Sequence, residues 1–139
     1  KSVKKPVIRT TKVAHEEKTL NFDVFVDDES YKKGLTIVQD TFTNYRADLH
    51  GFLPDEAVSI VRECLKKWWA EELILREQKA QRLNQRIIAN VKPFTIITGR
   101  GIHSVGGVSK VRKKVKYFLE NNSFVFLEEP SFFIVEGKK

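Results

Sequence analysis

The order of apolar segments along this chain predicts an α/β domain, a two-layer α/β sandwich with a mixed four-stranded sheet. Short runs rich in β-branched and aromatic residues alternate with two long stretches of helical periodicity, and two further runs follow the second stretch. A strand, a crossover helix and a second strand imply parallel pairing, and a hairpin adds an antiparallel pair. The 139 residues suit one domain with a core of ordinary size. The predicted order is therefore β-α-β-α-β-β.

The strands are predicted from short apolar runs. The first, at residues 45–49, is followed by His50 and Gly51, and the second, at 94–97, reads Phe-Thr-Ile-Ile and follows a proline. The other two occupy residues 124–127 and 132–135. The Glu-Glu-Pro-Ser sequence between them is typical of a hairpin turn.

The first helix is predicted to begin near Pro54, which suits the first helical position, with Asp55 and Glu56 favoured by the helix dipole. Its apolar stripe consists of Ala57, Val61, Cys64, Leu65 and Trp68. From residue 71 to 86 the sequence becomes mostly charged. A helix packed over that whole length would exceed the width of the domain, so we expect it to project from the body or to break near Asn84.

The second helix is predicted from about residue 107 to 121. One side of it is apolar, and this inner face consists of Val108, Val111, Val115, Phe118 and Leu119. Lysines and Arg112 occupy the remaining positions. The Asn-Asn pair at 121–122 is expected to end the helix.

The N-terminal part of the chain differs in character from the rest. Residues 1–18 are polar and basic with little periodicity, as in a loosely held arm. Residues 20–26 have enough apolar content to form an edge strand or to dock on the domain as an extended segment. The globular core is expected to start near Asp40, which divides the chain into a partly ordered extension, 1–40, and a domain, 41–139.

The net charge of +7 suggests a polyanionic partner. A basic block at residues 110–116 directly follows a glycine-rich segment. Nothing resembles a signal peptide, a lipidation motif or an apolar stretch long enough to span a bilayer, so we expect a soluble, cytoplasmic protein without a membrane partner. The lone Cys64 agrees with an intracellular location. The absence of methionine and the Lys at position 1 suggest a fragment of a longer protein.

A carboxylate and an imidazole lie two positions apart where the first predicted strand ends. Because side chains alternate along a strand, Asp48 and His50 should point to the same face. Such a pair is suited to acid-base chemistry, in which the imidazole transfers a proton and the carboxylate orients it.

A second polar segment, residues 98–107, follows the second predicted strand and supplies Arg100, another imidazole and four glycines. Glycines let the backbone approach an anion closely, and the start of the next helix offers free N–H groups to a phosphate. Sites in open α/β sheets gather beyond the carboxyl ends of the parallel strands. A phosphodiester is therefore predicted to lie between His50, Arg100 and the start of the second helix.

These residues resemble the Smr (small MutS-related) domain family from position 47 to about 135. The family has an LDLHG-like motif followed by Glu-Ala, here Asp48-Leu49-His50-Gly51 and Glu56-Ala57, and a TGRG or TGKG motif, here residues 98–101. The resemblance implies a fold like the C-terminal domain of bacterial translation initiation factor three. The 46 residues between the two motifs exceed the usual spacing. Residues 71–86 are therefore expected to be a charged insertion in the family pattern.

The same resemblance implies an endonuclease, closest in character to eukaryotic members that cut messenger RNA on stalled or collided ribosomes. Asp48, His50 and Arg100 would be catalytic, with Arg100 neutralising charge on the phosphorane-like transition state. The predicted nucleic-acid contacts are Gly99, Gly101, His103, Ser104, Gly106, Gly107, Lys110, Arg112 and Lys113.

Several alternatives remain open from the sequence. The Asp48 and His50 pair could be a structural hydrogen bond that orders the first loop, and His103 could transfer a second proton or merely contact the substrate. No cluster has the ligand spacing of known zinc motifs, so no metal site is assigned, although a divalent metal would suit these groups. The alternative functions are a non-catalytic RNA- or ribosome-binding module and a DNA nicking endonuclease. Low sequence specificity is expected, because no aromatic platform for stacking bases is visible in the sequence.

Overall fold

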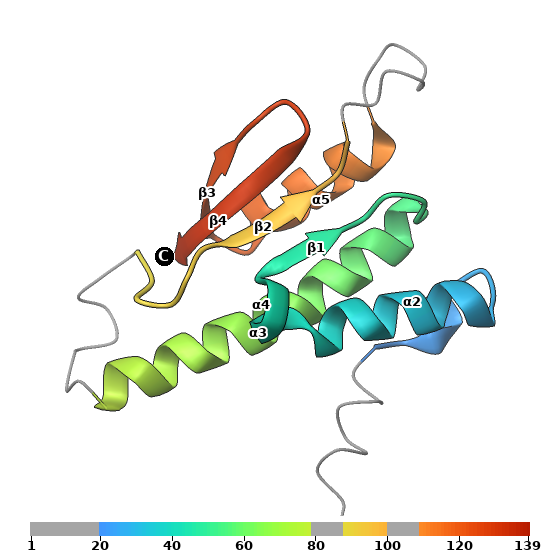
Figure 1. The fold of residues 1–139 in the computed structure, drawn as a ribbon. Helices are drawn as coiled ribbons and strands as arrows, with labels where there is room; N and C mark the ends of the chain where they lie inside the picture. The colour runs from blue at the N-terminus through green and yellow to red at the C-terminus, as the bar shows by residue number, and fades with distance from the viewer. Residues whose placement is uncertain (1–19, 79–87, 100–108) are drawn as a thin grey trace, which may run out of the picture.

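The computed structural model describes residues 20–78, 88–99 and 109–139, drawn in colour in Figure 1. The elements are η1 (Phe22–Val24), α2 (Asp28–Gln39), α3 (Thr41–Asn44), β1 (Arg46–Asp48), α4 (Pro54–Gln78), β2 (Phe94–Ile97), α5 (Lys110–Asn121), β3 (Phe124–Glu128) and β4 (Phe132–Lys138). From β1 onward the order is the predicted β-α-β-α-β-β. In these ranges, no helix has the length and apolar character needed to cross a membrane.

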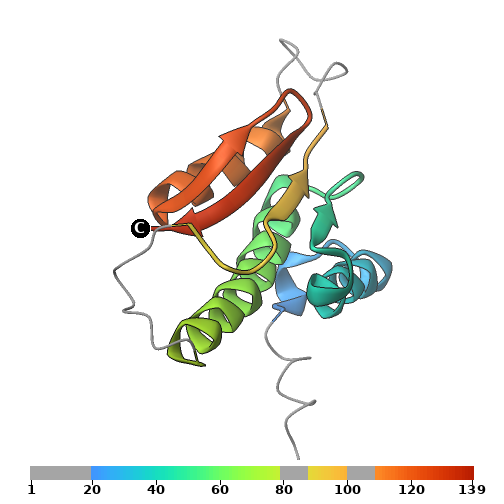
Figure 2. The same cartoon turned by 60° about the vertical axis from the view of Figure 1, so that its left-hand side comes forward.

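The four strands form one mixed sheet in the order β1-β2-β4-β3. As predicted, β1 pairs with β2 in parallel, and β3 and β4 form an antiparallel hairpin. The strand β4 lies between β2 and β3, because its other edge pairs antiparallel with β2. Figures 1 and 2 show α4 and α5 on the same face of this sheet, so the described part is a two-layer α/β arrangement with one face of the sheet left free of helices.

The core lies between the sheet and these helices. Strand residues facing the helices are fully buried, among them Ala47, Phe94, Ile96, Phe133 and Val135. They meet the α4 stripe predicted from the sequence, Ala57, Val61, Cys64, Leu65 and Trp68, and Val115 and Leu119 of α5. Burial raises the pKa of the Cys64 thiol to about 12, so this side chain is an inert part of the core.

The N-terminal segment corrects two expectations. Residues 20–26 do not form a strand, because the Asn21 side chain accepts a hydrogen bond from the Asp23 amide at 3.0 Å and starts the short helix η1. The Asp27 side chain then caps α2 by accepting from the Ser30 amide at 2.8 Å. Leu20 and Phe25 are buried, so the hydrophobic core begins well before Asp40.

The buried carboxylate of Glu56 holds the start of α4. One oxygen accepts from the Leu53 amide and the other from the Val26 amide, both at 2.8 Å. The first bond satisfies an N–H at the helix N-terminus, where the helix itself offers no acceptor. The second bond ties the N-terminal segment to the first turn of α4, which gives the Glu of the Glu-Ala motif a structural role.

The α4 helix begins at Pro54 as predicted, and the α5 helix begins later than predicted. The α4 helix is described as far as Gln78, so the expected break near Asn84 lies outside the described residues. Within the charged stretch, Glu72 and Arg76 are buried and joined by a 2.7 Å ion pair. The α5 helix starts at Lys110 rather than near 107, because the Ser109 side chain caps it by accepting from the Arg112 amide at 3.2 Å.

Candidate functional site

The two motifs begin at neighbouring strand ends. Asp48 and Ile97 are partners in the parallel pairing of β1 with β2, and the Leu49 amide donates to the Ile97 carbonyl at 2.9 Å. The Asp48 segment therefore leaves the sheet beside the segment that starts at Thr98. Figure 1 shows β1 and β2 running side by side in the same direction.

Burial alternates along the first motif as predicted, although β1 ends at Asp48 and His50 lies in the turn that follows. Ala47 and Leu49 are buried, whereas Asp48 and His50 are exposed. The Asp48 carboxylate accepts a hydrogen bond from the backbone amide of His50 at 3.0 Å. The His50 side chain is exposed, and none of the described residues forms a hydrogen bond with its imidazole. Gly51 follows with a φ of 87°, a left-handed conformation that lets the chain turn toward α4.

The start of the second motif is fixed by the hairpin. The Thr98 and Gly99 amides both donate to the Ser131 carbonyl, at 3.0 and 2.9 Å. Gly99 has a φ of 79°, so the chain turns there in a conformation that favours glycine. The remaining predicted residues of this motif lie outside the described residues, namely Arg100, Gly101, His103, Ser104, Gly106 and Gly107.

Arg112 was predicted to contact nucleic acid, but its guanidinium is occupied within the domain. It donates to the Glu129 and Pro130 carbonyls at 2.5 and 3.2 Å and pairs with Glu128 at 3.1 Å. Its guanidinium carbon also lies 4.5 Å from the centre of the Phe133 ring. Arg112 therefore clamps the β3–β4 turn, whose Ser131 carbonyl holds Thr98 and Gly99.

Other cations of α5 are available to a ligand. Lys110 and Lys113 are exposed in the first turn of α5, directly after the glycine-rich segment. No ion pair involves either of them within the described part of the chain. Lys116 is instead bonded to Glu128 at 3.1 Å, and this hydrogen bond, with a smaller one from Arg112, lowers the pKa of the Glu128 carboxyl.

Comparison with known proteins gives a consistent result, although no family model matches the chain. The chain is 32% identical over 95 residues to an Smr domain-containing protein of Schizosaccharomyces pombe. The aligned residues cover 68% of this chain and 17% of that protein. It is 35% identical over 82 residues to human NEDD4-binding protein 2, covering 58% of this chain and 4% of that one. The chain thus spans a small part of the length of these curated relatives.

Two solved domains are similar over most of their own length. The SMR domain of NEDD4-binding protein 2 is 30% identical, with 68% of this chain and 86% of that domain covered. The human small-MutS related domain is 31% identical, with 66% of this chain and 98% of that domain covered. This chain belongs to the Smr domain family. The assignment rests on sequence identity and not on backbone superposition, for which the TM-scores are 0.37 and 0.35.

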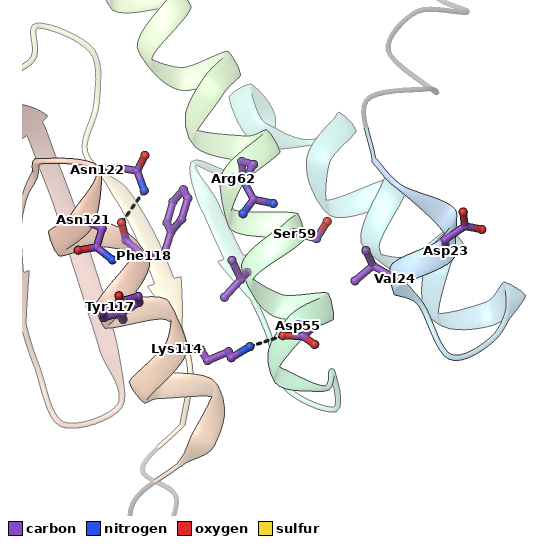
Figure 3. A pocket seen from close by; sticks show the side chains of 11 residues that line it. Asp23, Val24, Asp55, Ser59, Arg62, Lys114, Tyr117, Phe118, Asn121 and Asn122 are labelled. Atoms are coloured by element: carbon purple, nitrogen blue, oxygen red, sulfur yellow. Dashed lines mark hydrogen bonds and ion pairs between the residues drawn. The ribbon is translucent and has the colours of Figure 1, made fainter.

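A cavity of about 610 Å³ lies on the helical side of the Smr domain, between α4, α5 and the N-terminal segment (Figure 3). The ion pair between Lys114 and Asp55 crosses from one helix to the other in this cavity. Its charged lining residues are Asp23, Asp55, Arg62 and Lys114, so their formal charges cancel. It contains neither Asp48 nor His50, and it offers no excess of positive charge to a phosphate.

Within residues 20–78, 88–99 and 109–139 of the Smr domain, no group of three or more His, Cys, Asp or Glu side chains is arranged to hold a metal ion. Ser131 and the clamping role of Arg112 are the features that sequence reasoning missed. The hairpin-turn signal at 128–131 marked the correct segment, but no local pattern shows which strand end a turn will touch.

Proposed function

We propose that this Smr domain is an endonuclease that cleaves RNA at the carboxyl ends of β1 and β2. The observation that carries the proposal is the parallel pairing of Asp48 with Ile97, which brings the segment of Asp48 and His50 beside the start of the Thr98 motif. Lys110 and Lys113, exposed where α5 begins, would hold flanking phosphates. The family resemblance points to messenger RNA on stalled or collided ribosomes in the cytoplasm as the natural substrate.

The reaction needs no group beyond those of the protein and the substrate. The ribose 2′-oxygen attacks the adjacent phosphorus while an imidazole removes its proton, and the bond from phosphorus to the 5′-oxygen breaks as that oxygen gains a proton. The products are a 2′,3′-cyclic phosphate and a 5′-hydroxyl. His50 transfers one of the two protons, His103 is proposed for the other, and Arg100 stabilises the charge on the phosphoryl oxygens.

Cleavage of end-labelled RNA tests the proposal. We expect the domain to cut RNA in EDTA as well as in magnesium, and we expect His50→Ala and Arg100→Ala each to slow cutting by about a hundredfold or more. Arg62→Ala removes an exposed cation of α4 on the helical side and should cut like the wild-type domain. Cutting only in magnesium would contradict the metal-free mechanism. Cutting of matched DNA would favour the nickase, because DNA lacks the 2′-hydroxyl that the proposed mechanism requires.

One observation favours a second candidate, a non-catalytic RNA- or ribosome-binding module. The Asp48 carboxylate bonds the His50 backbone amide, as a residue with a purely structural role in the turn would do. A module would bind RNA in a salt-sensitive way without cutting it, alone or on collided ribosomes. Loss of cutting with retained binding in His50→Ala would exclude this candidate.

A further inference from the structure

The face of the sheet opposite α4 and α5 carries a row of side chains in line with Asp48. The register pairs Asp48 with Ile97 on β2, and Ile97 with Phe132 on β4. Residues paired directly across strands share a face, so these side chains point to the same side. Their chain neighbours Ala47, Ile96 and Phe133 are fully buried on the helical side, which fixes the row on the other side.

This row is apolar, partly exposed and close to the candidate catalytic groups. Ile97 and Phe132 are half-buried, although no described helix covers them (Figures 1 and 2). Neighbouring strands lie about 4.8 Å apart, so Phe132 is about 10 Å from Asp48 across the sheet. Phe132 also directly follows Ser131, whose carbonyl holds the Thr98 and Gly99 amides.

A second row continues the same surface. It consists of Arg46, Thr95, Ile134 and Leu127, paired in that order across β1, β2, β4 and β3. Arg46 is exposed, and no carboxylate of the described residues pairs with it. The surface therefore combines an aromatic ring, aliphatic side chains and an exposed cation beside the carboxylate and imidazole.

We propose that this surface receives an unpaired base of the nucleotide next to the cleaved phosphate, with Phe132 stacking on the base and Ile97 packing against its edge. The proposal rests on the proposed function, because the cleaved phosphate defines which base reaches the surface. Its consequence is a requirement for single-stranded substrate, since a base inside a duplex has both faces covered by its neighbours. The face of a sheet stacks bases of any identity, so the surface selects for strandedness and not for sequence.

A combined mutation of protein and RNA tests this directly. The probe is a five-nucleotide RNA with 2′-O-methyl ribose throughout, which cannot be cut by 2′-oxygen attack, and an abasic residue is moved through each position in turn. At one position, loss of the base should weaken binding to the wild-type domain by between about fivefold and a hundredfold. Phe132→Leu should weaken binding of the intact probe by a similar factor.

The decisive measurement is the affinity of Phe132→Leu for the abasic probe. If Phe132 stacks on that base, the abasic probe and Phe132→Leu together should weaken binding no more than either alone. Independent losses that multiply, or no loss at any position, would overturn the proposal. Tyr117→Leu is the matched control, because Tyr117 is 69% exposed and lies on α5 on the helical side.

Further readouts keep the proposal testable whatever Phe132→Leu does to folding. Phe132→Trp retains a stacking ring, so it should bind at least as well as the wild-type domain, and the base should quench its added indole fluorescence more than the abasic probe does. Equal quenching by the two probes would contradict stacking. Cutting of unmodified RNA, both free and on collided ribosomes, separates the hypotheses. Coupling without any cutting of either substrate would refute the nuclease alone, and cutting without coupling would refute the base surface alone.

Discussion

The carboxylate of Glu72 is fully buried in the middle of a hydrogen-bond network. It accepts from Arg76 Nε at 2.7 Å, from the Asn90 amide at 2.6 Å and from the Val91 amide at 3.0 Å. Burial by itself would raise the pKa of Glu72, but the hydrogen bonds from Arg76, Val91 and Asn90 outweigh it and lower the pKa below its ordinary 4.5. The network fastens α4 to the chain that leads into β2.

This lowered pKa predicts an acid-dependent stability. The ionised carboxylate stabilises the folded state above the unfolded pKa of 4.5, and this contribution is lost as the pH falls through the lower folded pKa. We expect Glu72→Gln to lower the free energy of unfolding by about 3 kcal/mol at pH 7, because the buried Arg76 loses its ion pair with Glu72. Urea unfolding at pH 7 and pH 3.5 should show a smaller acid-induced loss in this variant.

The control for this prediction is Glu77→Gln, an exposed carboxylate on the same helix. It should leave both the stability at pH 7 and the acid-induced loss close to wild type. Equal acid-induced losses in Glu72→Gln and the wild-type domain would show that Glu72 does not cause the pH dependence.

Arg112 is the residue whose removal should loosen the start of the second motif. Arg112→Ala deletes the contacts to Glu128, Glu129 and Pro130, and we expect a loss of about 2 kcal/mol in the free energy of unfolding. Amide hydrogen exchange at Thr98 and Gly99 should accelerate more than exchange in the middle of α4. Lys113→Ala, on the same helix but exposed, should change neither quantity appreciably, and unchanged exchange in Arg112→Ala would refute the clamping role.

At the scale of elements, the start of α4 depends on a contact from outside the helix. Glu56→Ala leaves the Val26 and Leu53 amides without their acceptor, and we expect it to cost about 2 kcal/mol of stability. Limited proteolysis should then cut within residues 20–39 faster than in the wild-type domain. Asp55→Ala is the control, since its side chain is 73% exposed and its pairing with Lys114 is a surface contact. Similar proteolysis of both variants would argue against the link.

Elements with a clear period were predictable, and those defined by side-chain caps were not. The strands and the two main helices follow from alternation and from the stripe that includes Val61 and Trp68. The helix α2 was not predicted, because its start depends on the Asp27 cap. The edge strand or docked extended segment was predicted for residues 20–26, which precede it. The likeness to the C-terminal domain of initiation factor three stays a prediction.

In the candidate site, too, local features could be predicted from the sequence, whereas contacts between distant segments could not. The exposure of Asp48 and His50, with Ala47 and Leu49 buried before and between them, could be predicted from local alternation. The alignment of Phe132 with Asp48 did not, because the register of β4 between β2 and β3 is a long-range property of the sheet. The contacts of Arg112 with the β3–β4 turn could not be predicted either, because a helical pattern does not distinguish a solvated cation from one that closes on a neighbouring turn. Its contact with nucleic acid stays a prediction.

At the scale of the whole molecule, the net charge of +7 predicts salt-sensitive binding to RNA. The logarithm of the binding constant should fall linearly with the logarithm of the salt concentration, and each phosphate contact contributes about 0.7 to the slope for a single strand. Lys110→Ala and Lys113→Ala should each reduce the slope by about that amount. Lys32→Ala on α2 removes the same charge elsewhere, and an equal change in its slope would indicate that only net charge matters.

The insertion of β4 between β2 and β3 determines when the site can exist. Asp48, Ile97 and Phe132 are far apart along the chain and meet only through the completed sheet. During synthesis, the segment of Asp48 and His50 leaves the ribosome long before the strand that must lie two positions away from it. In the growing chain, Asp48 and His50 therefore lack the proposed base-binding surface until residue 132 has emerged and the slow, long-range pairing has occurred. The proposed cutting site therefore cannot form on a nascent chain before the residues of β4 have left the ribosome.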